Sequence, residues 1–200
     1  MANLDKQREE VEKMLDEIEE KIKKEWGEES FASKYGLERD ILEGEDEVMG
    51  VLFVLPSKKE EVWEKIDEWF SKRKISIAVF SLGVREFIKK FVQKWKAENG
   101  ENLKIGEEIE GLEEDGIAIY INWTNTGIVL HQYKEGKFLS KSCKKIPLWE
   151  TSNGIWIVGF KDKETAKKFV EELKEKIKKE FGKDYSVNFH PLCWGEDQDF

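Results

Sequence analysis

Two histidines and two cysteines are the residues of this chain best suited to bind a metal. They are His131, Cys143, His190 and Cys193, all in the C-terminal part of the sequence. Zinc takes imidazole nitrogen and thiolate sulfur in a tetrahedral arrangement, and His190 and Cys193 have the spacing of half such a site. The other two lie twelve residues apart, without the usual paired-ligand spacing. A zinc site, a thiolate–imidazole pair for nucleophilic catalysis and four unrelated side chains all remain open; zinc is the only cofactor that the pattern suggests.

A lysine-rich stretch is the candidate for nucleic-acid binding. Between Lys134 and Lys183 there are 14 lysines and eight acidic residues, a net charge of +6, so the rest of the chain carries −15. Phosphate affinity depends on such local positive charge, and Lys167, Lys168 and Lys174 are the side chains that would provide it. The net charge of −9 for the whole chain argues against a general nucleic-acid binder.

An N-terminal helix is the candidate for binding a protein partner. Residues 3–26 carry a narrow apolar stripe on an otherwise charged helix. Such a stripe is typical of docking on another surface or of a short coiled coil; packing on the helix's own domain is the alternative. Trp149 and Trp194 fall in a loop and in the tail, where an amphipathic ring often serves an interface. The predicted partner-binding residues are Leu4, Val11, Leu15, Ile18, Ile22, Trp26, Trp149 and Trp194.

The sequence lacks the motifs of the common enzyme classes. It holds no glycine-rich phosphate loop, no nucleophile elbow and no paired-histidine helix motif, and we therefore predict no catalytic residues. The expected function is a non-catalytic interaction or assembly module, with a protein partner or with further copies of itself. The alternatives are a nucleic-acid-associated protein that uses residues 134–183 and a small zinc protein or enzyme.

Composition indicates a globular protein with a dense ionic surface. Charged residues make up 38% and hydrophobic residues 39% of the 200 positions, enough for a substantial core. Only four of the 34 basic residues are arginine, and enrichment in lysine and glutamate is a thermophile signal. No apolar run is long enough to span a membrane, no apolar signal region is present, and two distant cysteines suit a reducing compartment. We therefore expect a cytoplasmic, thermophilic type of protein without membrane contact.

Residues 154–189 are predicted to form the central strand–helix–strand unit. The run 154–160 is apolar and rich in β-branched and aromatic residues, which indicates a buried strand. Apolar residues then recur at helical spacing, with Asp162 as the N-cap and Gly182 as the C-terminal stop. Residues 185–189 alternate between apolar and polar, as in a half-buried strand.

This unit resembles the third strand and second helix of the RNA-recognition motif, over about residues 153–189. In that family, alternate aromatic residues on the exposed sheet face stack bases. The family's strand pattern is matched at Gly154, Val158 and Phe160, whereas Ile155 and Ile157 stand where the stacking aromatics belong. The resemblance implies the topology and no RNA-binding residues. The aliphatic pair further implies that the second face of the sheet is covered.

A similar strand–helix–strand unit is predicted at residues 50–80, with its second strand at 75–80. Two β-α-β units interleaved in one antiparallel sheet, with the helices on one face, form a ferredoxin-like sandwich. We predict this α+β fold as the core. It is elaborated by the N-terminal helix, an inserted helix at about 83–96 and a β-meander at 116–142; two separate small α+β lobes are the alternative.

The predicted domain organisation has two parts. Residues 1–27 form the amphipathic helix, and residues 28–200 form the α+β domain. The polar stretch 98–115, which holds several acidic residues and glycines, becomes an internal boundary if the chain forms two lobes.

Overall fold

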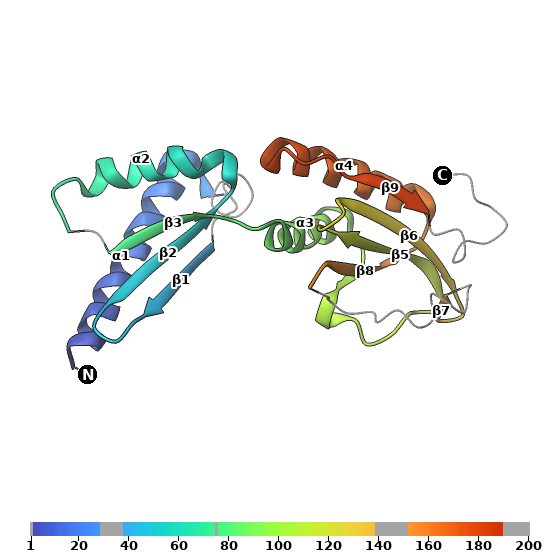
Figure 1. The fold of residues 1–200 in the computed structure, drawn as a ribbon, viewed down its shortest axis with the longest axis horizontal. Coiled ribbons are helices and arrows are strands. Elements are labelled where there is room, and N and C mark those ends of the chain that lie inside the picture. The colour runs from blue at the N-terminus through green and yellow to red at the C-terminus, as the bar shows by residue number, and fades with distance from the viewer. Residues whose placement is uncertain (1, 29–37, 75, 139–151, 190–200) are drawn as a thin grey trace. The chain divides into compact units, whose positions relative to one another are not determined.

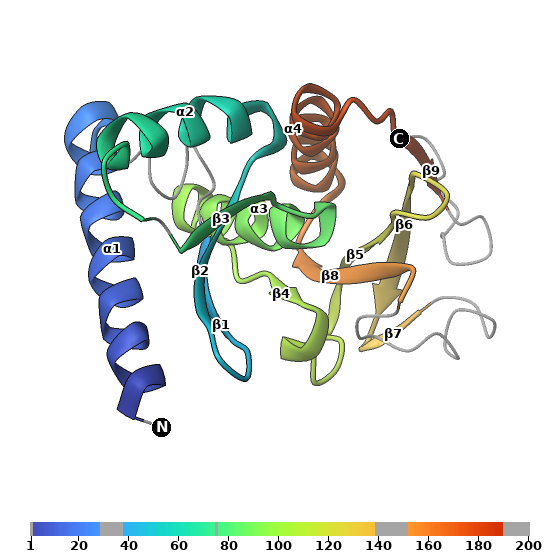
Figure 2. The same ribbon diagram turned by 60° about the vertical axis from the view of Figure 1, so that its left-hand side comes forward.

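The chain folds into two compact units, residues 1–83 and 84–200. Each unit has its own sheet and its own helices (Figure 1 and Figure 2), which confirms the predicted α+β class. The computed structural model describes residues 2–28, 38–74, 76–138 and 152–189.

Unit 1 consists of two helices and a three-stranded sheet. Its elements are α1 (Ala2–Trp26), β1 (Glu38–Glu43), β2 (Val48–Val54), a 3-10 turn (Pro56–Lys58), α2 (Lys59–Phe70) and β3 (Ile77–Ser81). The strand order is β1-β2-β3, with β1 antiparallel and β3 parallel to β2. The strand–helix–strand unit predicted at 50–80 is therefore confirmed as β2-α2-β3.

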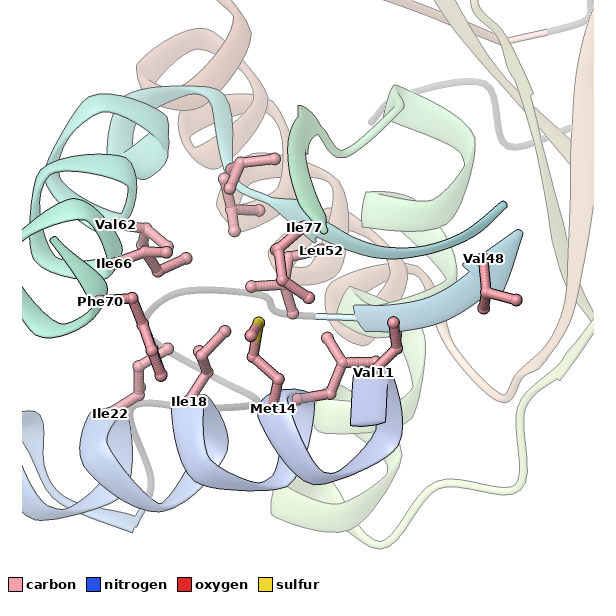
Figure 3. Close-up of a cluster of buried hydrophobic side chains, with 13 residues drawn as sticks. Val11, Met14, Ile18, Ile22, Val48, Leu52, Val62, Ile66, Phe70 and Ile77 are labelled. Carbon is pink, nitrogen blue, oxygen red and sulfur yellow. The ribbon is translucent and has the colours of Figure 1, made fainter. Parts of the chain in front are cut away.

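The core of unit 1 lies between the two helices and one face of the sheet. Side chains of α1 meet those of α2, β2 and β3 in one cluster (Figure 3). Gly50 of β2 permits this approach, because a Cβ there would lie 2.9 Å from Val11 Cγ1 and 3.3 Å from Leu15 Cδ2. The buried members of the cluster are Val11, Met14, Leu15, Ile18, Ile22, Val48, Leu52, Val54, Val62, Ile66, Phe70, Ile77 and Val79.

Arginine side chains join α1 to the rest of unit 1. Arg39 of β1 donates to Asp16 at 2.6 Å and to Glu19 at 3.0 Å. Arg73, just after α2, pairs with Glu17 at 3.1 Å. Because these groups are exposed, each pair is worth at most about 1 kcal/mol. The apolar cluster therefore dominates the stability of the docked helix, and the ion pairs help to orient it.

Unit 2 is built on a six-stranded sheet with two helices. Its elements are α3 (Val84–Asn99), β4 (Lys104–Ile105), a 3-10 turn (Gly106–Glu108), β5 (Asp115–Asn122), β6 (Gly127–Lys134), β7 (Lys137–Phe138), β8 (Gly154–Phe160), α4 (Lys163–Phe181) and β9 (Ser186–Phe189). The strands β4-β8-β5-β6 are antiparallel, and both β7 and the parallel β9 pair with β6, near its opposite ends (Figure 2). The predicted inserted helix is thus confirmed as α3, and the predicted β-meander is confirmed as β5-β6-β7 up to Phe138; its last residues, 139–142, lie outside the described residues.

The helices of unit 2 pack through aromatic rings. Phe169 of α4 lies 5.1 Å from Phe91 and 5.3 Å from Trp95 of α3, and 5.0 Å from Phe160 of β8, measured between ring centroids. All four side chains are buried. Edge-to-face aromatic pairs add about 0.5–1.5 kcal/mol each beyond the area that they bury. One phenylalanine thus ties α4 both to α3 and to the sheet.

Helix α4 begins and ends where the sequence indicates. Asp162 Oδ1 accepts a hydrogen bond from the Thr165 amide at 2.8 Å, as an N-cap does. Gly182 ends the helix with φ of 66°, and its N–H donates to the Lys178 carbonyl. The bond from the Thr165 amide, above all, lowers the pKa of Asp162, because it stabilises the ionised carboxylate.

Loss of this cap is expected to destabilise unit 2 modestly. Asp162→Ala should lower the free energy of unfolding by about 1 kcal/mol, whereas Asp162→Asn keeps an acceptor and should cost less. Because the folded-state pKa is depressed, the contribution of the charge is present above the unfolded pKa of about 4 and is lost as pH falls through the folded value. Amide hydrogen exchange in residues 163–177 at pH 7 and pH 3 tests both effects. Equal protection in wild type and Asp162→Ala would contradict the prediction.

The structure corrects the predicted ferredoxin-like sandwich. That arrangement needs the two strand–helix–strand units in one sheet, but β2 and β3 pair directly with each other, and β8 and β9 belong to a second sheet. The strands between β8 and β9 are β5 and β6 of the same unit. The two-lobe alternative matches the observed fold. The units divide between Gly83 and Val84, so the stretch 98–115 lies within unit 2, and the N-terminal helix is part of unit 1.

Candidate functional site

The apolar stripe of α1 is part of the core of unit 1. All six predicted partner-binding residues of this helix lie in or against the core cluster, so packing on its own domain is the interpretation that the structure supports. The other two predicted residues, Trp149 and Trp194, lie outside the described residues. Of the six, Val11, Ile18 and Ile22 are buried (Figure 3). Leu15 is buried as well, and Leu4 and Trp26 are half-buried.

Only one of the four predicted zinc ligands falls in the described part of the chain. His131 lies on β6, is 2% exposed, and has its ring centroid 4.7 Å from that of Trp156. Cys143, His190 and Cys193 lie outside the described residues, so the zinc site stays a prediction. Residues 2–28, 38–74, 76–138 and 152–189 contain no group of three or more side chains placed to hold a metal ion.

The sheet face of unit 2 that lies away from the helices carries an aromatic cluster. Trp156 and Val158 belong to this cluster, and Trp156 is fully buried. Because side chains alternate along a strand, Ile155 and Ile157 lie on the opposite face. The sequence-based placement of these two isoleucines on the second face is therefore wrong by one residue. The expectation that the second face is covered is confirmed.

Two tyrosines of this cluster lie across glycines of the neighbouring strand. A Cβ at Gly116 would overlap the Tyr133 ring, and one at Gly154 would lie 2.6 Å from Tyr120 Cζ. Burial raises the pKa of the Tyr133 hydroxyl, and the nearby Glu113 carboxylate raises it further. The rings fill the space that the glycines leave, so this face is a packed second core.

The three predicted nucleic-acid-binding lysines lie on α4 but not on one face of it. At 100° per residue, Lys167 and Lys174 fall on one flank of the helix, seven residues apart, and Lys168 falls on the other. There the Lys168 Nζ lies 5.9 Å from the centroid of the Trp95 ring. Lys168 therefore packs beside α3. Nucleic-acid binding by these three residues stays a prediction.

Large exposed hydrophobic side chains occur in unit 1. In the described part of the chain they are Leu42, Trp63 and Phe80, at 53%, 45% and 47% exposure. Phe80 pairs with Phe53 across β2 and β3, and their ring centroids lie 6.1 Å apart on the sheet face away from the core. A lone exposed leucine is ordinary. Trp63 and Phe80, however, both lie at β3.

Strand β3 has an open side. Among the described residues it pairs with β2 alone. At its ends, the Ser76 carbonyl accepts from the Gly50 amide at 2.8 Å, and the Leu82 amide donates to the Val54 carbonyl at 2.6 Å. Backbone groups on a strand point alternately to one neighbour and to the other. The residues whose N–H and C=O groups point away from β2 are therefore Ile77, Val79 and Ser81.

A groove of about 370 Å³ lies along this open side. Because α2 connects β2 to β3, it runs beside the strand (Figure 1). An exposed indole thus stands next to backbone groups that have no strand partner in the described part of the chain, the arrangement in which proteins accept an extended peptide as an added strand. The groove is lined by Lys59 and Trp63 of α2 and by Ile77, Ala78 and Val79 of β3.

The sequence contains only a partial signal for this surface. Whether a strand lies at an edge depends on which strands pair, and residues 75–80 alone do not encode that. Trp63 does carry a signal. The buried residues of α2 are Val62, Ile66 and Phe70, spaced by four, and Trp63 falls one position outside that row. A tryptophan displaced from the buried row of a helix indicates a ring at the border of the core.

Comparison of the chain with protein-family models, with curated proteins and with solved structures finds no match. None of the helices in the described ranges combines the length and the apolar character needed to cross a membrane. The functional interpretation therefore depends on the open side of β3 and the side chains around it.

Proposed function

We propose that the protein is a non-catalytic interaction module that binds an extended protein segment as an added strand at the open side of β3. The observation that supports it is the position of Trp63 and Phe80, two large exposed side chains, on either side of that strand edge. The added strand would exchange main-chain hydrogen bonds with Ile77, Val79 and Ser81. Such bonds supply affinity, and the flanking side chains supply specificity.

The composition of β3 favours this use of its edge. Natural proteins protect edge strands with charged side chains, proline or bulges. Strand β3 reads IAVFS, with no charge and no proline. Side chains of the added strand would alternate between the α2 side, where Trp63 lies, and the opposite face, where Phe80 lies. We therefore expect the bound segment to be apolar at consecutive positions.

Charge favours a protein partner over a nucleic acid at this surface. Exposed phenylalanines on neighbouring strands can also stack bases of a single strand. Residues 1–83, however, carry 22 acidic and 14 basic residues, a net charge of −8. Such a unit repels a phosphate backbone, whose binding depends on positive charge.

Selection from a random heptapeptide library on the immobilised full chain tests the proposed function. We expect enrichment of peptides with consecutive apolar residues. Two variants should weaken their binding at least tenfold. Ser81→Pro removes an N–H that points to the open side without removing a bond to β2, and Trp63→Ala removes the exposed ring.

Matched controls separate this effect from general damage. Ser81→Ala keeps the backbone N–H, and Glu64→Ala changes an exposed neighbour of Trp63 outside the groove lining. Both should bind the selected peptides as the wild type does. Enriched peptides that bind Ser81→Pro and Trp63→Ala with unchanged affinity, or no enrichment at all, would exclude strand addition at β3.

A further inference from the structure

We infer that the strand added to β3 is β3 of a second copy of this chain, which gives a two-fold symmetric dimer with a continuous six-stranded sheet. This inference depends on the proposed function, since it uses the same open edge. It goes further by naming the partner, the register and the residues that select it. Three features of unit 1 support it: the backbone pattern of β3, the sizes of its side chains and the charges that flank Trp63.

The backbone pattern favours one antiparallel register. The outward-pointing residues are Ile77, Val79 and Ser81, so a two-fold axis through Val79 aligns Val79 with itself and Ile77 with Ser81 of the second copy. In an antiparallel ladder, residues that face each other in this way exchange both of their hydrogen bonds. This register uses all three outward residues of both copies. A shift of the axis to Ala78 or Phe80 leaves some of them without a partner.

The same register fits the side chains on the sheet face away from the core. It places Phe80 directly opposite Ala78 of the second copy, in a pair without hydrogen bonds, where side chains approach most closely. A large ring beside a methyl group fills space without overlap. The exposed area of Phe80 is thereby covered by the second copy, next to Phe53 at 6.1 Å in its own chain.

The charges on the open flank of α2 are self-complementary. Lys59, Trp63 and Asp67 follow one another at four-residue intervals along α2, and the first two line the groove. Because four residues span a little more than one helical turn, Asp67 falls on the same flank as Trp63. Helix α2 starts where β2 ends and so runs antiparallel to β3, with Lys59 toward Ser81 and Asp67 toward Ile77. A two-fold axis near Trp63 therefore brings Lys59 of each copy to Asp67 of the other, across the two indole rings.

The two charged groups are available for this contact. Within the described chain, neither Lys59 nor Asp67 has an ion-pair partner. The opposite flank of α2 differs, since Lys65 pairs with Glu25 of α1 at 2.6 Å. That hydrogen bond raises the pKa of Lys65. The opposite flank of the helix is thus held by its own chain, and the open flank carries one charge of each sign on either side of Trp63.

The absolute mass in solution is the first test. The full chain has a mass of 23.5 kDa, so a dimer should scatter light as a particle of twice that mass. Lys59→Glu and Asp67→Lys should each weaken the dimer about tenfold, because each replaces two exposed attractions by two repulsions. An equimolar mixture of the two variants should restore dimers, since the glutamate introduced in one chain then faces the lysine introduced in the other. Mixtures that stay monomeric, while the wild type dimerises, would exclude this pairing of charges.

Disulfide trapping tests the register. In a background with Cys143→Ser and Cys193→Ser, a mixture of Ala78→Cys and Phe80→Cys should form cross-linked heterodimers. The Cα atoms of such a pair lie about 4.5 Å apart, within reach of a disulfide. Either variant alone should not cross-link, because two copies of the same residue are offset by two positions along the strands and lie about 8 Å apart. Cross-linking of either variant alone, or a mixture that forms no cross-linked heterodimer while the wild type dimerises, would overturn the register.

The combined outcomes separate the two proposals. The wild-type chain could be monomeric up to 1 mM, on the order of the weakest self-association worth testing, and yet select peptides that Ser81→Pro fails to bind. This result would overturn the dimer and retain strand addition at β3. A dimer that Ser81→Pro leaves intact would overturn the inference, because the edge would not be the contact. A dimer that Ser81→Pro dissociates, with rescue in the charge mixture, would support both.

Discussion

Alanine at Gly159 is expected to destabilise unit 2 by about 3 kcal/mol or more. Gly159 has φ of +109°, a conformation that residues with a Cβ rarely adopt, and a Cβ there would lie 2.7 Å from the Asn102 carbonyl oxygen. The first effect alone is of order 1–3 kcal/mol. The second is an overlap with backbone, which cannot turn aside as a flexible side chain can. The positive φ and the overlap add to each other. The overlap arises because the chain segment just before β4 lies against β8 at this glycine.

The position follows from a bulge in β8. The register between β5 and β8 shifts between Ile117 and Ile119, so that β8 has one extra residue at this point. Bulges of this kind often place a glycine at positive φ. Gly111→Ala is the matched control, since that glycine is exposed, lies in the same unit and has open space around it. Amide hydrogen exchange in residues 154–160 measures the difference; protection in Gly159→Ala equal to that in Gly111→Ala would contradict the prediction.

Helices and their ends could be predicted because their causes are local. Asp162 caps α4 through an amide three residues away, and Gly182 ends it through a carbonyl four residues back. Gly100 ends α3 in the same way, with φ of +63° and a bond to the Lys96 carbonyl. Each of these devices is complete within five residues of sequence. The periodicity of the helices between them is equally local, so α1, α3 and α4 all match their predicted positions.

Sheet pairing could not be predicted because its causes are distant. Strand β4 has two residues, Lys104–Ile105, which is too short for a pattern. It falls in the polar stretch 98–115, where the sequence predicts no strand. This part of the chain nevertheless contributes to the core: Ile105 of β4 and Leu103 just before the strand are buried. Strand β4 pairs with β8 on the side where, in a ferredoxin-like sheet, a strand of one of the two β-α-β units would pair instead. The fold of unit 2 thus depends on a pairing between residues more than 50 positions apart.

The face of a strand cannot be read from a continuous apolar run. Residues 154–160 are buried on both faces, with the single exception of half-buried Gly159, so no alternation marks which side chains meet the helices. The resemblance to the RNA-recognition motif places Ile155 and Ile157 on the sheet face away from the helices. In the structure that face carries Trp156, so the sequence-based placement is wrong by one residue. The bulge at Gly159 interrupts the alternation, so that Phe160 lies on the helix side together with Ile155 and Ile157. Only the register of β8 with β5 shows which face each side chain occupies.

The candidate surface is the least predictable part for the same physical reason. The residues of β3 look like those of any buried strand, and the open edge results from the absence of a further partner among the described residues. The charge pattern on α2 has no meaning until the groove is located beside it. Lys59 and Asp67 are ordinary helix-surface residues in the sequence. Their significance comes from the strand that α2 flanks.

Alanine at Ile18 is expected to destabilise unit 1 by about 2–5 kcal/mol, because it leaves a cavity where a fully buried side chain of α1 meets the core. The narrow apolar stripe of this helix also suits an assembly device, and the two interpretations predict different results. If the stripe were an interface, Ile18→Ala would change the mass in solution and leave the exchange protection of β2 intact. If it is core, protection of residues 48–54 falls while the folded fraction keeps its mass.

Glu20→Ala is the matched control on the same helix, since Glu20 is exposed and makes no ion pair in the described chain. It should change the stability of unit 1 by no more than about 0.5 kcal/mol.

The Ile18→Ala variant also tests the independence of the dimer formed through β3. The proposed dimer contact uses backbone groups on the open side of β3 and the side chains Phe80, Lys59 and Asp67, none of which belongs to the core cluster that holds Ile18. Ile18→Ala at low temperature should therefore still dimerise with the affinity of the wild type. If Ile18→Ala were as stable as Glu20→Ala but had an altered mass in solution, the result would contradict the burial of this stripe. It would then support α1 as an interface.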